Sequence, residues 1–258
     1  MEPTLCNMTG IENMKTENST ASTMTHPTVR LKIKILRQQS QPEKPYWENF
    51  DYEGSNEITV ASLLDFINFN DDIINDKGEK TTRINWECSC LQGMCGSCAM
   101  VINEKPALAC ETFLKDLKNP KNEITICPLK KFPVIKDLIV DRSSIYENLK
   151  KSNIFIGEYK KGKNENDDFR HQYDVSKCLK CALCLEVCPN YTSGNSFFGS
   201  LFANECYLVS SRNNEKLSEI KKIYKEHFEK SCSKSLACVD VCPMKIPTLA
   251  SIAKMNKK

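Results

Sequence analysis

Three groups of cysteines are the residues of this chain best suited to chemistry. They contain eleven of the fifteen cysteines in the 258-residue sequence, and two of the groups end in a Cys-Pro pair. The spacing within each group lets one loop present several thiolates together. Thiolates are the ligands that proteins offer to zinc ions and to iron–sulfur clusters, and such clusters transfer electrons. The cysteines therefore predict a metal-containing electron carrier.

The first group predicts a [2Fe–2S] site. Its spacing, C-x4-C-x2-C with a distant fourth cysteine, is typical of plant-type ferredoxins and consists of Cys90, Cys95, Cys98 and Cys110. Gly93 and Gly96 let the loop turn tightly, so that backbone N–H groups can point at the sulfurs. A zinc site that includes Cys95 and Cys98 is the competing interpretation. The nearby Cys88 is expected to be a free thiol.

The second group has the C-x2-C-x2-C-x3-C-P spacing of a bacterial ferredoxin run, and the third group is one cysteine short of it. In paired runs of this kind, the fourth cysteine of each run binds the other cluster. This exchange predicts a [4Fe–4S] site held by Cys178, Cys181, Cys184 and Cys242. Three thiolates remain for the other site, namely Cys188, Cys232 and Cys238.

Ser235 stands where a complete third group would have its middle cysteine. With one thiolate missing, the second site of the pair favours a [3Fe–4S] cluster. The alternative is a cubane whose fourth iron binds the Ser235 hydroxyl or water, although an alkoxide is a poorer ligand for iron than a thiolate. The sequence thus predicts three different clusters in one chain.

The other cysteines and the histidines lack ligand spacing. We expect none of them to bind metal, which applies to Cys6, Cys127, Cys206, His26, His171 and His227. The odd number of cysteines argues against a disulfide framework and favours a reducing compartment. The net charge of +3, from 36 basic and 33 acidic residues, argues against a nucleic-acid partner.

The segments around the first cysteine group predict a small sheet and a helix. Apolar residues alternate from Thr28, which predicts a strand with one buried face formed by Val29, Leu31, Ile33 and Ile35. A turn over residues 38–45 leads to a returning strand over residues 46–52, and a helix follows Thr59. Further short strands are predicted at residues 99–103, 107–109 and 124–127.

Beyond Val140 the apolar residues recur every three or four positions, which predicts a helical second half. The predicted fold class is therefore α+β with two domains, at residues 28–135 and 136–258. A disordered extension is expected over residues 1–27, and the charged segment 160–168 is expected to be an exposed loop. No apolar stretch approaches the roughly 20 residues that a membrane-spanning helix needs.

The order of these motifs over residues 28–252 resembles the iron–sulfur subunits of succinate dehydrogenase and fumarate reductase. The matching segments are Ser89–Met100, Leu108–Cys110, Cys178–Pro189 and Cys232–Pro243. The resemblance implies an N-terminal β-grasp domain, like a plant-type 2Fe-2S ferredoxin, followed by a C-terminal α-helical ferredoxin domain. It also implies clusters arranged in the order two-iron, four-iron, three-iron.

The same resemblance implies the partners of the chain. Electrons would pass between a flavoprotein subunit, whose FAD interconverts succinate and fumarate, and a quinone near the three-iron cluster, so that no carbon chemistry occurs on this chain. A membrane anchor would hold the complex at the cytoplasmic face of a bacterial inner membrane.

The sequence departs from many family members near the expected quinone site. Many members carry aromatic residues, often tryptophan, after the second cysteine group and some carry a histidine at the start of the third. Here the corresponding segments are 190–193 and Ser233. This favours menaquinone over ubiquinone, with Tyr191 either a hydrogen-bond partner of the quinone or a buried structural residue. The alternative function is an iron–sulfur subunit of another dehydrogenase or of a thiol/disulfide-linked reductase, with a non-quinone acceptor.

Overall fold

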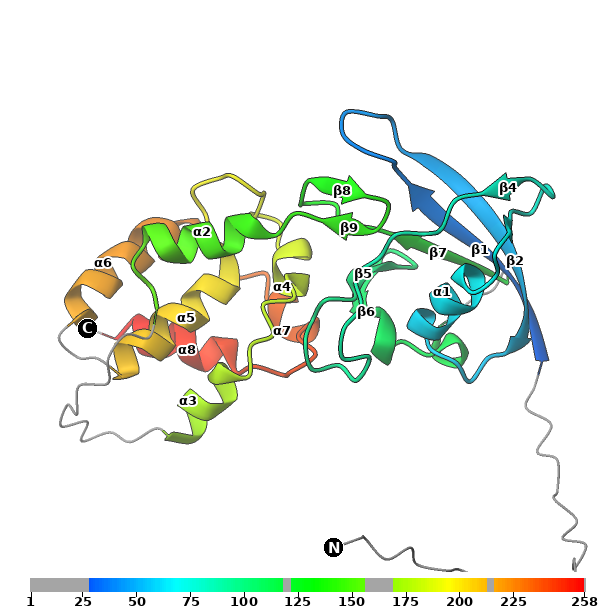
Figure 1. Ribbon diagram of the computed structural model, residues 1–258. Coiled ribbons are helices and arrows are strands. Elements are labelled where there is room, and N and C mark those ends of the chain that lie inside the picture. Colours follow the sequence, from blue (N-terminus) through cyan, green and yellow to red (C-terminus); the bar gives the residue numbers. More distant parts are fainter. Residues whose placement is uncertain (1–27, 118–121, 156–168, 213–215, 258) are drawn as a thin grey trace, which may run out of the picture.

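The computed structural model describes residues 28–117, 122–155, 169–212 and 216–257. The molecule is elongated, with the strands gathered at one end and most helices at the other (Figure 1). This arrangement confirms the predicted α+β fold class. The expected extension over residues 1–27 and the expected loop over 160–168 lie outside the described residues, as do Cys6 and His26.

A five-stranded mixed sheet forms the first half, in the order β2-β1-β7-β5-β6. The first strand pairs antiparallel with β2 and parallel with β7, so that Ile33 lies beside Phe50 on one side and Ile124 on the other. The strands are β1 (Thr28–Arg37), β2 (Tyr46–Ser55), β5 (Ala99–Ile102), β6 (Lys105–Leu108) and β7 (Glu123–Cys127).

The alternation predicted for the first strand is present in the structure. Ile33 and Ile35 are fully buried, whereas Lys32 is exposed. Helix α1 (Val60–Asn68) packs its apolar face into the same core, and the hydroxyl of Thr59 caps its first turn by accepting a hydrogen bond from the Ser62 N–H at 3.1 Å. The first strand, its partner and this helix are thus confirmed.

Two features of the first half differ from the predictions. The strand expected at residues 107–109 ends at Leu108, and Cys110 lies instead in a short 3-10 helix, η1 (Ala109–Glu111). The two small hairpins β3–β4 and β8–β9 were not predicted, because strands of two or three residues are too short to show a period. Their strands, together with the second 3-10 helix, are β3 (Ile73–Ile74), β4 (Lys80–Thr81), β8 (Val134–Lys136), β9 (Ile139–Val140) and η2 (Leu114–Asp116).

The second half is helical, as predicted. Helix α5 (Gly199–Arg212) lies at its centre, and α3, α4, α6 and α8 pack around it. No helix in the described part of the chain is long and apolar enough to cross a membrane. The other helices are α2 (Ser143–Lys151), α3 (Phe169–Ser176), α4 (Leu183–Glu186), α6 (Leu217–His227), η4 (Glu229–Ser231), α7 (Ala237–Asp240) and α8 (Thr248–Met255).

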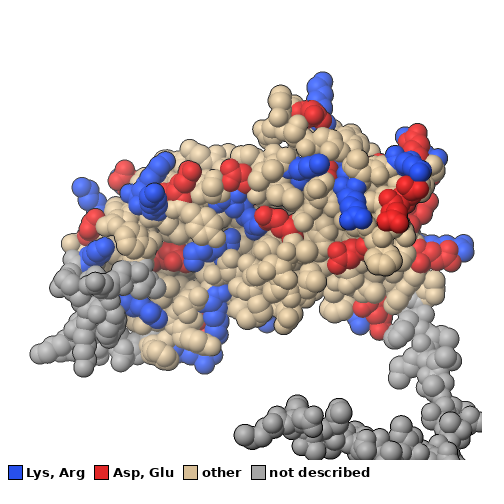
Figure 2. All heavy atoms as spheres, viewed as in Figure 1, with Lys and Arg blue, Asp and Glu red and all other residues tan. Residues whose placement is uncertain are grey.

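Charged residues of both signs are interspersed over the face shown in Figure 2, while uncharged residues cover most of its lower middle, where the strands meet the helices. A shallow depression lies in this region, between β6 on one side and α4 and α7 on the other. The two halves are in contact beside it, where α4 packs against β6.

A buried ion-pair network joins the sheet to the β8–β9 hairpin, which spans the predicted domain boundary at residues 135/136. Arg37 is fully buried and donates to Asp137 Oδ1 at 2.9 Å and to Glu48 Oε2 at 2.6 Å. Burial alone would raise the pKa of Asp137, but hydrogen bonds from Arg37 and Asn85 outweigh it and the net pKa is lowered. The hairpin is therefore held against β1, and the position of the boundary remains a prediction.

Replacing Asp137 with alanine should lower the free energy of unfolding by roughly 3–5 kcal/mol, because it leaves the buried Arg37 charge without its main partner. The matched control is Arg30→Ala, which breaks the exposed Arg30–Glu53 pair and should lower the free energy of unfolding far less, because solvent screens an exposed pair. Urea unfolding of the full chain measures both changes, and equal losses would contradict the network's importance.

The difference in unfolding free energy between wild type and Asp137→Ala should depend on pH. Because the pKa of Asp137 is lowered in the folded chain, its stabilising effect is fully present above the ordinary aspartate pKa of about 4. The effect is lost as the pH falls through the lowered folded value. The unfolding free energies of wild type and Asp137→Ala should therefore converge on acidification.

Candidate iron–sulfur cluster sites

The strands of the first sheet bring the first cysteine group together. Cys98 immediately precedes β5 and Cys110 follows β6, and these strands pair antiparallel with Ala99 opposite Leu108. As a result the Cys98 and Cys110 sulfurs lie 3.3 Å apart. Cys90 and Cys95 belong to the loop that leads into β5, so one loop and one hairpin supply all four thiols.

Backbone N–H groups point at the sulfurs of this group. The Gly93 N–H donates to Cys110 Sγ at 3.2 Å, while the Gln92 and Met94 N–H groups donate to Cys90 Sγ at 3.4 and 3.3 Å. Gly93 has φ +69°, a left-handed conformation that glycine adopts without strain, and a Cβ there would displace the Glu111 carboxylate, which would lie 2.1 Å away. Donors of this kind stabilise thiolate charge and influence the reduction potential of a bound cluster.

Two thiols of this group have pKa values shifted in opposite directions. Hydrogen bonds from Ser97 and from the Cys90 backbone lower the pKa of Cys95 to about 6, whereas burial raises the pKa of Cys98 to about 12. A buried thiol next to other thiols ionises only when a cation compensates its charge. Four thiols with aimed N–H groups therefore fit a two-iron cluster, whose iron supplies that charge.

The helical half places the predicted four-iron ligands around one small cavity. The cavity, of about 30 Å³, is lined by Cys178, Cys181, Cys184 and Cys242. Cys242 comes from the far end of the chain, and the Ile246 N–H donates to its sulfur at 3.5 Å. Burial raises the pKa of Cys178 to about 11 and that of Cys184 well above its ordinary value. These four thiols therefore fit an iron–sulfur cluster, because its iron would compensate the charge of the buried thiolates.

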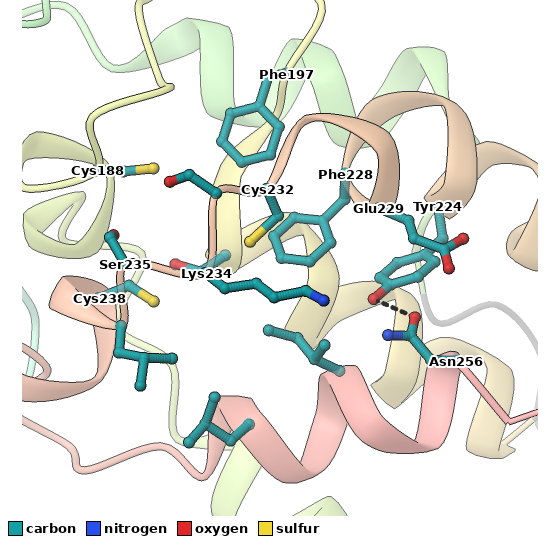
Figure 3. Close-up of a pocket in the computed structure, with 15 residues that line it drawn as sticks. Cys188, Phe197, Tyr224, Phe228, Glu229, Cys232, Lys234, Ser235, Cys238 and Asn256 are labelled. Carbon is teal, nitrogen blue, oxygen red and sulfur yellow. Dashed lines mark hydrogen bonds between the residues drawn. The ribbon is translucent and has the colours of Figure 1, made fainter.

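A second, larger cavity contains the predicted three-iron ligands. Its volume is about 370 Å³, and Cys188, Cys232, Cys238 and Ser235 all lie on its wall (Figure 3). Cys238 also borders the smaller cavity, so the two sites are neighbours. Cys242 thus lies with the second cysteine group and Cys188 with the third. This placement is compatible with the predicted exchange of fourth cysteines between the two groups.

The backbone around Ser235 repeats the backbone around Cys181. Lys180 and Ala182, which flank Cys181, have φ values of +53° and +72°, and Ala182 is the N-cap residue of helix α4. Lys234 and Leu236, which flank Ser235, have φ values of +59° and +64°, and Leu236 is the N-cap residue of helix α7. The serine therefore occupies the structural counterpart of a cysteine position, as its spacing predicted.

The sequence did not reveal the remaining wall of the larger cavity. Tyr224 donates a hydrogen bond to Asn256 Oδ1 at 2.9 Å, and the Lys234 side chain extends across the opening in Figure 3. The apolar helical spacing of α6 and α8 predicted that each helix has a buried face. It did not indicate whether that face borders a cavity or a packed core. The apolar part of the wall consists of Phe197, Phe228, Leu236, Leu249 and Ile252.

Tyr191, the candidate quinone partner, does not line this cavity. It is 2% exposed, and its ring lies 5.8 Å from that of Phe132. Its surroundings are those of a core residue, which favours the structural interpretation.

The residues expected not to bind metal have other surroundings. Cys127 and Cys206 are buried within β7 and α5, and Cys88 is exposed. His171 shares a hydrogen bond with Ser251, and His227 Nδ1 lies 2.9 Å from the Ser196 carbonyl oxygen. Over the described ranges, no three Cys, His, Asp or Glu side chains converge on a single metal ion.

Comparison with known proteins finds iron–sulfur relatives of this chain. Residues 32–147 match the family model of the 2Fe-2S iron-sulfur cluster binding domain. The chain is 36% identical to the succinate dehydrogenase iron-sulfur subunit of Bacillus subtilis, covering 86% of this chain and 90% of that protein. It is 26% identical to the fumarate reductase iron-sulfur subunit of Wolinella succinogenes, covering 85% and 92%.

A solved structure shares the fold. A chain of the Mycobacterium smegmatis Sdh1 complex in the apo form superimposes with a TM-score of 0.71 at 20% identity, covering 89% of this chain and 96% of that one. The predicted role as an electron-transfer subunit of an oxidoreductase is confirmed by the relatives. This chain belongs to the family of iron–sulfur subunits of succinate dehydrogenase and fumarate reductase.

Proposed function

We propose that this chain passes electrons one at a time between an FAD-containing subunit, which interconverts succinate and fumarate, and a quinone. When bound, a [2Fe–2S], a [4Fe–4S] and a [3Fe–4S] cluster supply the one-electron chemistry. The chain supplies the thiolates, the N–H donors and the exclusion of water that set their potentials. The proposed domains are a β-grasp domain at residues 28–135 and an α-helical ferredoxin domain at 136–258.

The observation that carries this proposal is the pairing of two unequal cavities in the helical half. One is lined by the four thiols assigned to the four-iron site and, at its border, by Cys238, and its neighbour is lined by Cys188, Cys232, Cys238 and Ser235. Four thiolates suit a cubane, and three suit the three-iron cluster. The proposed ligands are Cys90, Cys95, Cys98 and Cys110 for [2Fe–2S], Cys178, Cys181, Cys184 and Cys242 for [4Fe–4S], and Cys188, Cys232 and Cys238 for [3Fe–4S].

We assign the quinone end to the side of the larger cavity. Leu236 and Leu249 are partly exposed on its wall, where an anchor subunit with an apolar surface would dock. Among the described residues, neither tryptophan nor histidine lines it, which supports menaquinone as the quinone. The complex would lie at the cytoplasmic face of a bacterial inner membrane, held there by its anchor.

Purification of the native complex through this chain tests the function. The expected result is co-purification of a flavin-containing subunit and a membrane anchor, with succinate reducing the iron–sulfur EPR signals and a menaquinone analogue reoxidising them. A complex that lacks a flavin subunit, or one whose reduced clusters respond to a disulfide acceptor and not to quinones, would overturn the proposal.

Metal analysis tests the ligand assignment. Anaerobically purified chain should contain about nine iron atoms, and Cys90→Ser should lose about two of them. The control is Cys88→Ser, because Cys88 lies beside the same loop but is not an assigned ligand, and its iron content should be unchanged. A wild-type content near six, or zinc in place of iron, would refute the assignment.

Replacing Ser235 with cysteine should allow a cubane to form in the larger cavity, because it restores the missing thiolate. The iron content should rise by about one atom, the potential of that centre should fall, and the EPR signal of the oxidised three-iron cluster should disappear. Ser233→Cys, on the same cavity wall, is the matched control and should leave the signal intact. Survival of the signal in Ser235→Cys would show that the missing corner lies elsewhere.

A further inference from the structure

The backbone of the first cysteine loop touches the second cysteine group directly. Gly96 lies between Cys95 and Cys98 and has φ +78°. A Cβ on Gly96 would lie 2.7 Å from Cys181 Cβ, closer than real Cβ atoms come, and 3.1 Å from Cys181 Cα, which is tighter than most real contacts. Glycine at this position therefore lets the loop of one cluster site pack against a ligand of the next.

Arg142 holds this loop from the helical half. It is the residue that precedes α2, and its guanidinium donates to the Gly96 carbonyl oxygen at 3.1 Å and to the Ser97 carbonyl oxygen at 3.3 Å. The same group forms an ion pair with Glu87, just before the loop. The Arg142 side chain is only 16% exposed. The Arg142 side chain thus binds Glu87, which precedes Cys90, and the carbonyl groups of Gly96 and Ser97, which follow Cys95.

The geometry of this contact suits arginine in particular. A guanidinium presents several N–H donors in a rigid plane, so it can satisfy two neighbouring carbonyls and a carboxylate together, which a lysine ammonium on a flexible stem does poorly. Hydrogen bonds from a charged donor are stronger than neutral ones, and buried carbonyls that lose them are costly. The loop consequently has one well-determined position against Cys181.

We propose that Arg142 is a positioning residue that clamps the 95–98 loop onto Cys181 and so sets the spacing between the first two cluster sites. The inference rests on the proposed function, because spacing matters here only if both sites carry clusters. Electron transfer falls exponentially with the separation of the two centres. A loop held from the second half therefore controls the rate of the first transfer between clusters.

Arg142→Gln in the native complex tests this inference, with Arg170→Gln as the matched control because it breaks an exposed arginine–carboxylate pair on α3. In Arg142→Gln the amides of residues 95–98 should exchange hydrogen about tenfold faster or more, since a charged hydrogen-bond donor is lost. The spin–spin interaction between the reduced two-iron and four-iron centres, measured by pulsed EPR, should weaken. Arg170→Gln should change neither quantity.

The outcomes separate this inference from the proposed function. Wild-type complex without the first two clusters would refute the proposed function, whereas Arg142→Gln with full iron, unchanged exchange and unchanged spin coupling would refute the clamp alone. If Arg142→Gln loses iron, the same two measurements are made on Arg142→Lys, which keeps the charge but lacks the planar guanidinium. Unchanged hydrogen exchange and unchanged spin coupling in Arg142→Lys would then refute the clamp. Gly96→Ala keeps the arginine but forces the loop off Cys181, so it should also weaken the spin coupling.

Discussion

The structure depends on bringing thiols from distant segments into shared buried volumes. Cys242 lines the same cavity as Cys178 and Cys184, and Cys188 lines the neighbouring cavity with Cys232 and Cys238. Burial raises the pKa of Cys178 and of Cys184 and so opposes the ionisation of both thiols. Helix α5 is buried along most of its length and packs against the helices around it, and this packing fixes the positions of the thiols.

The two halves of the molecule are joined at several points that combine charge with burial. Glu186 on α4 accepts hydrogen bonds from the backbone N–H groups of Lys130 and Lys131 at 3.0 and 3.1 Å, just beyond β7. Arg142 reaches from the helical half to the first cysteine loop, and Arg37 reaches from β1 to the β8–β9 hairpin. An electron carrier benefits from such ties, because rigid spacing between redox centres keeps each transfer fast and reproducible.

The sequence predicted well those features that depend on local pattern. The alternation from Val29 to Ile35 gave the strand β1, and the helical spacing after Thr59 gave α1 with its cap. It missed the short hairpins β3–β4 and β8–β9, which exist because neighbouring segments support them. It also extended a strand to Ala109, whereas the strand ends at Leu108 and Ala109 begins a 3-10 helix. In each case, contacts outside the local window decide the conformation.

The sequence by itself determined which thiols are available, how they are grouped and which position lacks one, because ligand spacing is a local property of the chain. Only the tertiary structure decided that Ser235 has the backbone geometry of Cys181 and that two unequal cavities lie side by side. The contact of Gly96 with Cys181, and the arginine that secures it, were likewise invisible in the sequence. These residues are far apart along the chain, and only the packing of the two halves brings them together.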